Sequence, residues 1–305
     1  MHATIISRTH AALLALLCGL TPLGCDPHDH NDEAEAGSEA GSEASSEAST
    51  DASSEASTDA TMDTGSETGS DDEQDDEPQD PMTIEIRENE PNLTMINAWT
   101  PKDGVSVDEV AAALTDGLSA DIRELPGFVV AGVHASQDES NVLVYGHWTD
   151  QDSLAAAQTA IGEGQAPTFA AAFGLADSAA HPYRVASVIT SSGASSMTIA
   201  EDSSMLTMVN TWTPKEGASV DEVAAALIDG INAEISTLPG FMGASVLASL
   251  DESNVRVYGH WEDQAALDGV QTAAQNGEIP LFSQVFALAD SLAHPYAVRS
   301  VIAAP

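Results

Sequence analysis

The chain of 305 residues matches itself without a gap when it is shifted by 113 positions, so that residues 93–189 fall on residues 206–302. Every Trp, Tyr and Phe then coincides with a residue of its own type, as Trp99 does with Trp212 and Trp148 with Trp261. Large aromatic side chains usually anchor cores. A period of this length exceeds the roughly 20–50 residues of a solenoid unit. We therefore predict two copies of one small domain, over residues 82–190 and 197–305.

Each copy carries the pattern of a ferredoxin-like βαββαβ unit. Ser106-Val-Asp-Glu109 is a capping box that should open a helix, and Ser219-Val-Asp-Glu222 repeats it. Around that helix in the first copy we predict strands over 93–100, 128–136, 142–148 and 183–189, and further helices over the Ala-rich segments 151–161 and 168–180.

A sheet with helices on one face leaves its other face bare, and the second copy is available to cover it. Only a short link, residues 190–197, separates the copies. The predicted fold class is therefore α+β, with two ferredoxin-like repeats packed sheet to sheet as an intramolecular pseudo-dimer, in the manner of a dimeric α/β barrel.

The N-terminal residues 1–24 are typical of an export signal, with Arg8 before the apolar run Ala11–Leu20. Leu23-Gly24-Cys25 resembles the end of a bacterial lipoprotein cleavage box, in which the Cys receives a diacylglycerol. Cleavage would also remove Cys18, which leaves Cys25 without a disulfide partner. We expect a protein of the bacterial cell envelope that is anchored to a membrane through lipidated Cys25. Ordinary secretion is the alternative.

Residues 25–81 are predicted to form an acidic, disordered tether, because they contain no aromatic residue and no Lys or Arg. The formal net charge of the whole chain is −41. Such a surface repels phosphate backbones, so a nucleic-acid partner is not expected.

A family resemblance comes from the segment Leu125-Pro-Gly-Phe128, which leads through His134 and Asp138 to Tyr145-Gly-His-Trp148. It is similar to the antibiotic biosynthesis monooxygenase (ABM) family, and Leu238 to Trp261 repeats the pattern. The resemblance implies dimeric α/β barrels. Its quinone-forming members oxidise polycyclic phenols with O₂ and need no cofactor, so we expect none here. Other members degrade haem.

The resemblance places catalytic roles on His134 and Trp148. The family often has an Asn four residues before that Trp, where this chain has Val144 and Val257. Asn97 could supply the missing amide, which would add it to the catalytic set. For ligand binding we expect Trp99 together with the second-copy residues Asn210, Trp212 and Trp261. The second copy has Leu247 where the first has His134.

Two functions follow as hypotheses. One is a cofactor-independent monooxygenase of small aromatic or phenolic compounds. The other is a non-catalytic lipoprotein that binds a small hydrophobic ligand through the duplicated barrel. The sequence contains no Cys-x-x-Cys or His-x-x-x-His pair and no Gly-rich nucleotide motif, so we predict no metal site.

Overall fold

The computed structural model describes residues 82–201 and 203–305. The predicted signal, the acidic tether and Cys25 lie outside the described residues. We refer below to residues 83–190 as the first half and to residues 196–303 as the second half.

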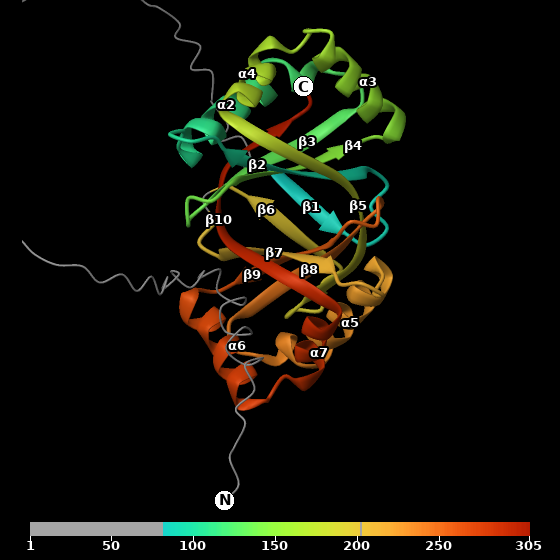
Figure 1. The fold of residues 1–305 in the computed structure, drawn as a ribbon, viewed down its shortest axis with the longest axis vertical. Coiled ribbons are helices and arrows are strands. Elements are labelled where there is room, and N and C mark those ends of the chain that lie inside the picture. The colour runs from blue at the N-terminus through green and yellow to red at the C-terminus, as the bar shows by residue number, and fades with distance from the viewer. Residues whose placement is uncertain (1–81, 202) are drawn as a thin grey trace, which may run out of the picture. The chain divides into compact units, whose positions relative to one another are not determined.

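The two halves contain the same elements in the same order (Figure 1). The first half consists of β1 (Thr83–Arg87), β2 (Leu93–Pro101), α2 (Val107–Ala120), a 3₁₀ turn (Ile122–Glu124), β3 (Phe128–Ser136), β4 (Val142–Trp148), α3 (Gln151–Gly162), α4 (Pro167–Leu175) and β5 (Ala176–Thr190). The second consists of β6 (Ser196–Ala200), β7 (Leu206–Pro214), α5 (Val220–Ala233), a 3₁₀ turn (Ile235–Thr237), β8 (Phe241–Ser249), β9 (Val255–Trp261), α6 (Gln264–Asn276), α7 (Pro280–Leu288) and β10 (Ala289–Ala303). Both predicted capping boxes are confirmed, at the starts of α2 and α5.

Eight strands form one closed barrel in the order β10-β3-β4-β2-β5-β8-β9-β7. The long strands β5 and β10 close it. Residues 176–183 of β5 pair with β2 in the same half, and residues 183–190 pair with β8 in the other half. Strand β10 pairs in the same way with β7 and β3. The predicted α+β fold with facing sheets is thus confirmed, and backbone hydrogen bonds join the two sheets at both edges.

The start of β5 differs from the sequence prediction. Residues 176–180 were expected to continue a helix, but α4 ends at Leu175 and the strand begins at Ala176. Alanine has the highest helix propensity, which is why this Ala-rich segment predicts a helix. Pairing with the edge of β2 satisfies the backbone groups of the segment instead, so tertiary context overrides the local preference.

Strands β1 and β6 were not predicted. They form an antiparallel ribbon in which Glu85 pairs with Thr198, and these two residues are themselves 113 positions apart. Ile84 and Ile199 of the ribbon are buried in the same cluster as the barrel interior. The ribbon appears between the two halves in Figure 1.

A glutamate follows each strand of the ribbon, Glu88 after β1 and Glu201 after β6. Each accepts hydrogen bonds from a residue next to a β-bulge in one of the long strands. Oε1 of Glu88 accepts hydrogen bonds from Oγ of Ser187 at 2.9 Å and from the amide of Val188 at 3.1 Å. Oε1 of Glu201 accepts one from the amide of Val301 at 2.5 Å. Both acceptors therefore secure the chain next to a bulge, one in β5 and one in β10.

The apolar core has three parts. One lies between sheet and helices in each half, and the third fills the barrel interior. In Figure 1 the helices lie at the two outer ends of the molecule and the strands lie between them. In the part of the chain that the structure describes, no helix is both long enough and apolar enough to span a bilayer.

Candidate functional site

The first half contains a cavity of about 250 Å³ between the outer face of its sheet and the helices α2, α3 and α4. Strand alternation decides which side chains reach it. Met95, Asn97 and Trp99 of β2 line the cavity, whereas Ile96 faces the barrel interior. Phe173 of α4 also lines the cavity and is 44% exposed, so the cavity reaches the surface beside this ring.

Aromatic side chains form two walls of the cavity. At one end, the rings of Phe128 and Trp148 meet edge to face with centroids 5.5 Å apart. At the other end, Trp99 lies 5.8 Å from Phe169 and 4.8 Å from Phe173, again measured between centroids. These separations are typical of stabilising aromatic pairs. A flat apolar ligand would find a ring on either side.

Hydrogen-bonding groups are few in this cavity. Nε1 of Trp99 is buried and has no hydrogen-bond partner among the described residues. Oδ1 of Asn97 accepts a hydrogen bond from Oγ of Ser178 at 2.9 Å, which fixes the orientation of the amide. Because a buried N–H without a partner costs about 1–3 kcal/mol, the indole of Trp99 favours a ligand that brings an acceptor oxygen. The structure thus brings three predicted residues, Asn97, Trp99 and Trp148, to one cavity.

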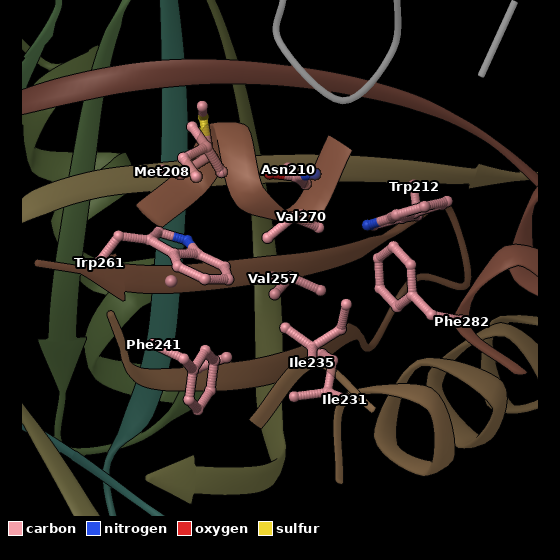
Figure 2. Close-up of a pocket in the computed structure, with 13 residues that line it drawn as sticks. Met208, Asn210, Trp212, Ile231, Ile235, Phe241, Val257, Trp261, Val270 and Phe282 are labelled. Carbon is pink, nitrogen blue, oxygen red and sulfur yellow. The ribbon is translucent and has the colours of Figure 1, made fainter. Parts of the chain in front are cut away.

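The equivalent cavity of the second half has a volume of only about 50 Å³. Asn210, Trp212 and Trp261 line it, as expected from the repeat. Figure 2 shows Val270 in the middle of the group, between the two tryptophans. The first half has Ala157 at that position, 113 residues earlier. The larger side chain of Val270 therefore takes up space that is empty in the first half.

His134 does not reach either cavity, which corrects the expectation that it shares one with Asn97 and Trp148. The side chain is fully buried in the barrel interior, on the other face of the sheet. Its Nε2 lies 2.9 Å from the hydroxyl of Tyr258, and its Nδ1 lies 3.1 Å from the carbonyl oxygen of Gly132. Burial lowers the pKa of His134 from 6.5 to about 4, so the ring is neutral near pH 7.

An antibiotic biosynthesis monooxygenase model matches residues 205–275. This segment holds Asn210, Trp212 and Trp261, and thus most of the smaller cavity. No curated protein matches the chain.

Three solved structures illustrate what this chain is similar to. An anthrone oxidase-like protein is 19% identical, with a TM-score of 0.60, over 72% of this chain and 97% of its own. A putative monooxygenase from Fusobacterium nucleatum subsp. nucleatum is 8% identical, with a TM-score of 0.49, over 70% and 95% of the two chains. A mutant of SnoaB, a cofactor-independent oxygenase from Streptomyces nogalater, is 22% identical, with a TM-score of 0.28, over 32% and 96%. The likeness to the first of these agrees with the ABM-like barrel, and it concerns the fold.

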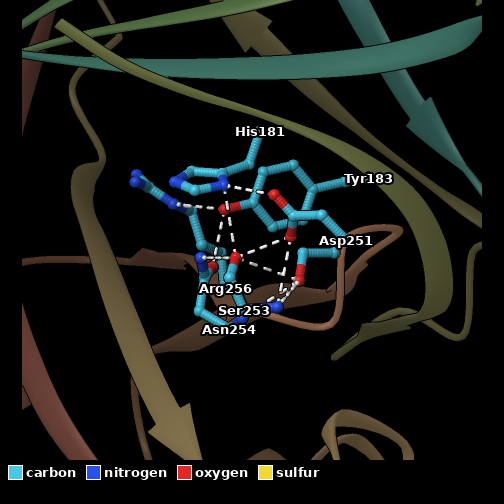
Figure 3. Close-up of polar contacts among 7 residues, drawn as sticks. His181, Tyr183, Asp251, Ser253, Asn254 and Arg256 are labelled. Carbon is cyan, nitrogen blue, oxygen red and sulfur yellow. Dashed lines mark hydrogen bonds and ion pairs between the residues drawn. The ribbon is translucent and has the colours of Figure 1, made fainter.

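Two polar clusters that the sequence prediction missed connect the halves. Nδ1 of His181 lies 2.6 Å from Oδ2 of Asp251, and Nδ1 of His294 lies 2.6 Å from Oδ2 of Asp138 (Figure 3 shows the first pair). Oγ of Ser253 also contacts Nδ1 of His181, at 3.2 Å. Ser and Asp thus share one ring nitrogen, whereas a nucleophilic triad needs them on opposite nitrogens. We interpret both clusters as structural contacts, and the repeated Asp-x-Ser-Asn and His-Pro-Tyr motifs are the signal that could have predicted them.

Proposed function

We propose that the protein is a cofactor-independent monooxygenase whose first-half cavity takes a small aromatic compound with a phenolic or carbonyl oxygen. The observation that carries this proposal is that Trp99, whose buried indole N–H has no partner among the described residues, lines an aromatic-walled cavity of about 250 Å³. An engineered apolar cavity of about 150 Å³ is known to hold benzene. The first-half cavity therefore has room for an aromatic compound larger than benzene, and the 50 Å³ cavity of the second half has not.

The chemistry begins with loss of a proton from the substrate to solvent, and solvent returns a proton to the peroxide that forms later. None of the side chains that line the first-half cavity is titratable. The acidity must therefore come from the substrate, as in a methylene group beside a carbonyl that becomes a phenolate on enolisation. Hydrogen bonds from Trp99 and from the amide of Asn97 would stabilise the resulting oxyanion and so lower the pKa of the substrate.

The remaining steps take place between substrate and O₂. The electron-rich carbanion reduces O₂, and a carbon–oxygen bond forms. Loss of water then leaves a carbonyl group. In sum, a CH₂ group and O₂ give a C=O group and H₂O, so one oxygen atom stays in the product and the other leaves as water. The chain contributes an aromatic-walled cavity and the hydrogen-bond donors of Trp99 and Asn97.

Oxygen uptake tests this proposal. The full-length protein is supplied with anthrone, and the rate without protein is subtracted. We expect one O₂ consumed for each quinone formed. Asn97→Leu should reduce the rate about tenfold through the lost donor, while Asn210→Leu, the matched change in the smaller cavity, should leave it unchanged. If the protein accelerates the oxidation of neither anthrone nor related phenols, the oxygenase proposal is wrong.

Non-catalytic binding is the second candidate, and the lack of a titratable side chain in the cavity lining favours it. In that case the protein would bind anthrone-like compounds at a ratio of one to one and leave their rate of oxidation unchanged. Calorimetry without O₂, set beside the uptake measurement, separates the two functions.

The cellular setting is a further part of the proposal and is supported by the sequence alone. We place the protein in the bacterial cell envelope, held at a membrane by a lipid on Cys25. Cys25→Ser should move the protein from the membrane fraction to the soluble fraction. An unchanged membrane fraction would contradict the anchor.

A further inference from the structure

Arg256 is an arginine buried inside the barrel, at a position where the first half has Leu143. It lies on β9 opposite Thr211 of β7, and only 6% of it is exposed. A buried positive charge is costly unless it is paired and hydrogen-bonded. The partners of this guanidinium therefore need to be accounted for.

The barrel supplies Arg256 with a single hydrogen bond. Its Nε donates to the hydroxyl of Tyr183 at 2.9 Å, and that hydroxyl donates in turn to Oδ1 of Asn254 at 2.6 Å. The guanidinium carbon also lies 5.9 Å from the centre of the Tyr183 ring. Across residues 82–201 and 203–305, no carboxylate forms an ion pair with Arg256.

Arg256 also lines a cavity other than the first-half cavity described above. Figure 3 shows both terminal nitrogens of Arg256 pointing away from the other residues drawn. Arg256 lines a cavity of about 340 Å³ that lies at the ends of β2 and β7, where the hydroxyl-bearing residues Thr100, Thr211 and Thr213 also line it. Two forked nitrogens without a partner among the described residues, in a cavity that five hydroxyl-bearing side chains also line, suit the geometry of an oxyanion.

We propose that this cavity binds the carboxylate of a small organic acid through the terminal nitrogens of Arg256. The charges favour a monoanion. Arg256 is the only Lys or Arg that lines the cavity, and Asp290 lines it as well, although Lys215 contacts that carboxylate at 3.3 Å. A doubly charged phosphate would therefore meet one cation and a nearby negative charge. The remaining lining includes Leu292, which is 54% exposed, and this side chain suits an apolar tail at the mouth.

This site is separate from the proposed oxygenase cavity. The two cavities have no lining residue in common, because one faces the helices and the other faces the barrel interior. Either proposal can therefore fail without the other. A purely structural Arg256, which only holds Tyr183 in place, would leave the protein indifferent to carboxylates.

The test is a titration of the full-length protein with benzoate, with neutral benzamide and with inorganic phosphate, followed by calorimetry and by the melting temperature. We expect saturable binding of benzoate and none of benzamide. Arg256→Leu, which installs the first-half residue, should weaken benzoate binding about tenfold or more. Arg299→Leu is the matched control, because it removes the same charge from an exposed arginine paired with Asp108 and should leave binding unchanged.

Arg256→Lys keeps the proposal testable if the leucine variant does not fold. Lysine retains the charge and loses the fork, so benzoate binding should still weaken about tenfold. The proposal is overturned if benzoate does not bind the wild-type protein. Binding that survives both Arg256 substitutions would overturn it too, and tighter binding of phosphate than of benzoate would refute the assignment to carboxylates.

Discussion

Replacing Trp99 by Phe removes one N–H from the larger cavity and keeps an aromatic ring in place. The indole nitrogen is buried without a partner in the ligand-free protein, and Nε1 of Trp212 is in the same situation in the second half. The two positions lie 113 residues apart, and each ring packs edge to face on a Phe, Phe169 or Phe282. Trp212→Phe is therefore a matched control.

The expected changes in stability and in ligand affinity follow from these contacts. Removing an unpaired buried N–H should stabilise the folded protein by about 1–3 kcal/mol. The smaller Phe ring makes fewer packing contacts, which should destabilise it by about the same amount. The free energy of unfolding should therefore change little in either variant. Ligand binding differs, because a net hydrogen bond of about 1 kcal/mol is lost. This corresponds to an increase of about fivefold in Kd, and only for Trp99→Phe, since the cavity beside Trp212 has a volume of only about 50 Å³.

Anaerobic calorimetry with anthrone measures Kd without turnover, and chemical denaturation measures stability. The reasoning fails if Trp99→Phe binds anthrone as tightly as the wild type. It also fails if Trp212→Phe weakens binding as much, because the ligand would then not be specific to the first half. A large loss of stability in Trp99→Phe alone would show that the indole N–H is satisfied in solution.

Three further predictions test other parts of the structure. Ala157→Val should weaken anthrone binding by narrowing the larger cavity. Val270→Ala should enlarge the smaller cavity at a cost of about 2 kcal/mol in stability, and calorimetric titration with anthrone checks both variants. The free energy of unfolding should fall as the pH drops from 6.5 to about 4, because burial lowers the pKa of both His134 and His260 to about 4 and the unfolded chain takes up the protons first. His134→Leu should remove about half of that fall in a pH series of denaturation curves. Gly117→Ala should destabilise the protein by about 2 kcal/mol or more, because the new Cβ would lie 2.4 Å from the backbone of α4. Gly269→Ala is the control: its Cβ would meet open space, so the substitution should stabilise helix α6 by about 1 kcal/mol. Chemical denaturation measures both.

Much of the fold is readable from the sequence because local patterns and the repeat agree. The aromatic residues that recur at 113 positions do anchor the cores, with Trp99 and Trp212 both fully buried. The start of β5 is not readable, because its conformation depends on pairing with the open edge of β2. That edge is not visible from the Ala-rich segment itself.

The candidate site was predictable in part, and a single bulge explains the main failure. Asn97 and Trp99 lie on one strand face, as simple alternation requires. By the same alternation His134 shares a face with Phe128, which lines the cavity. A register shift between Phe128 and Val130 reverses the faces of the rest of β3, so that Ala131 faces the cavity and His134 faces the barrel interior. Arg256 was not predicted, because charged side chains are mostly exposed and strand alternation alone does not show that this one is buried.

The joining of both halves into one chain has a consequence for how the sites can change. In a barrel assembled from two identical protomers, each mutation occurs twice, and loss of one cavity means loss of both. Here β5 and β10 pair with strands of both halves and hold them together. The interior side chains of one half can therefore be substituted without the same substitution in the other half. Val270 and Arg256 are such differences: within the described residues, the larger helix-side cavity is found in the first half, and the buried arginine is found in the second.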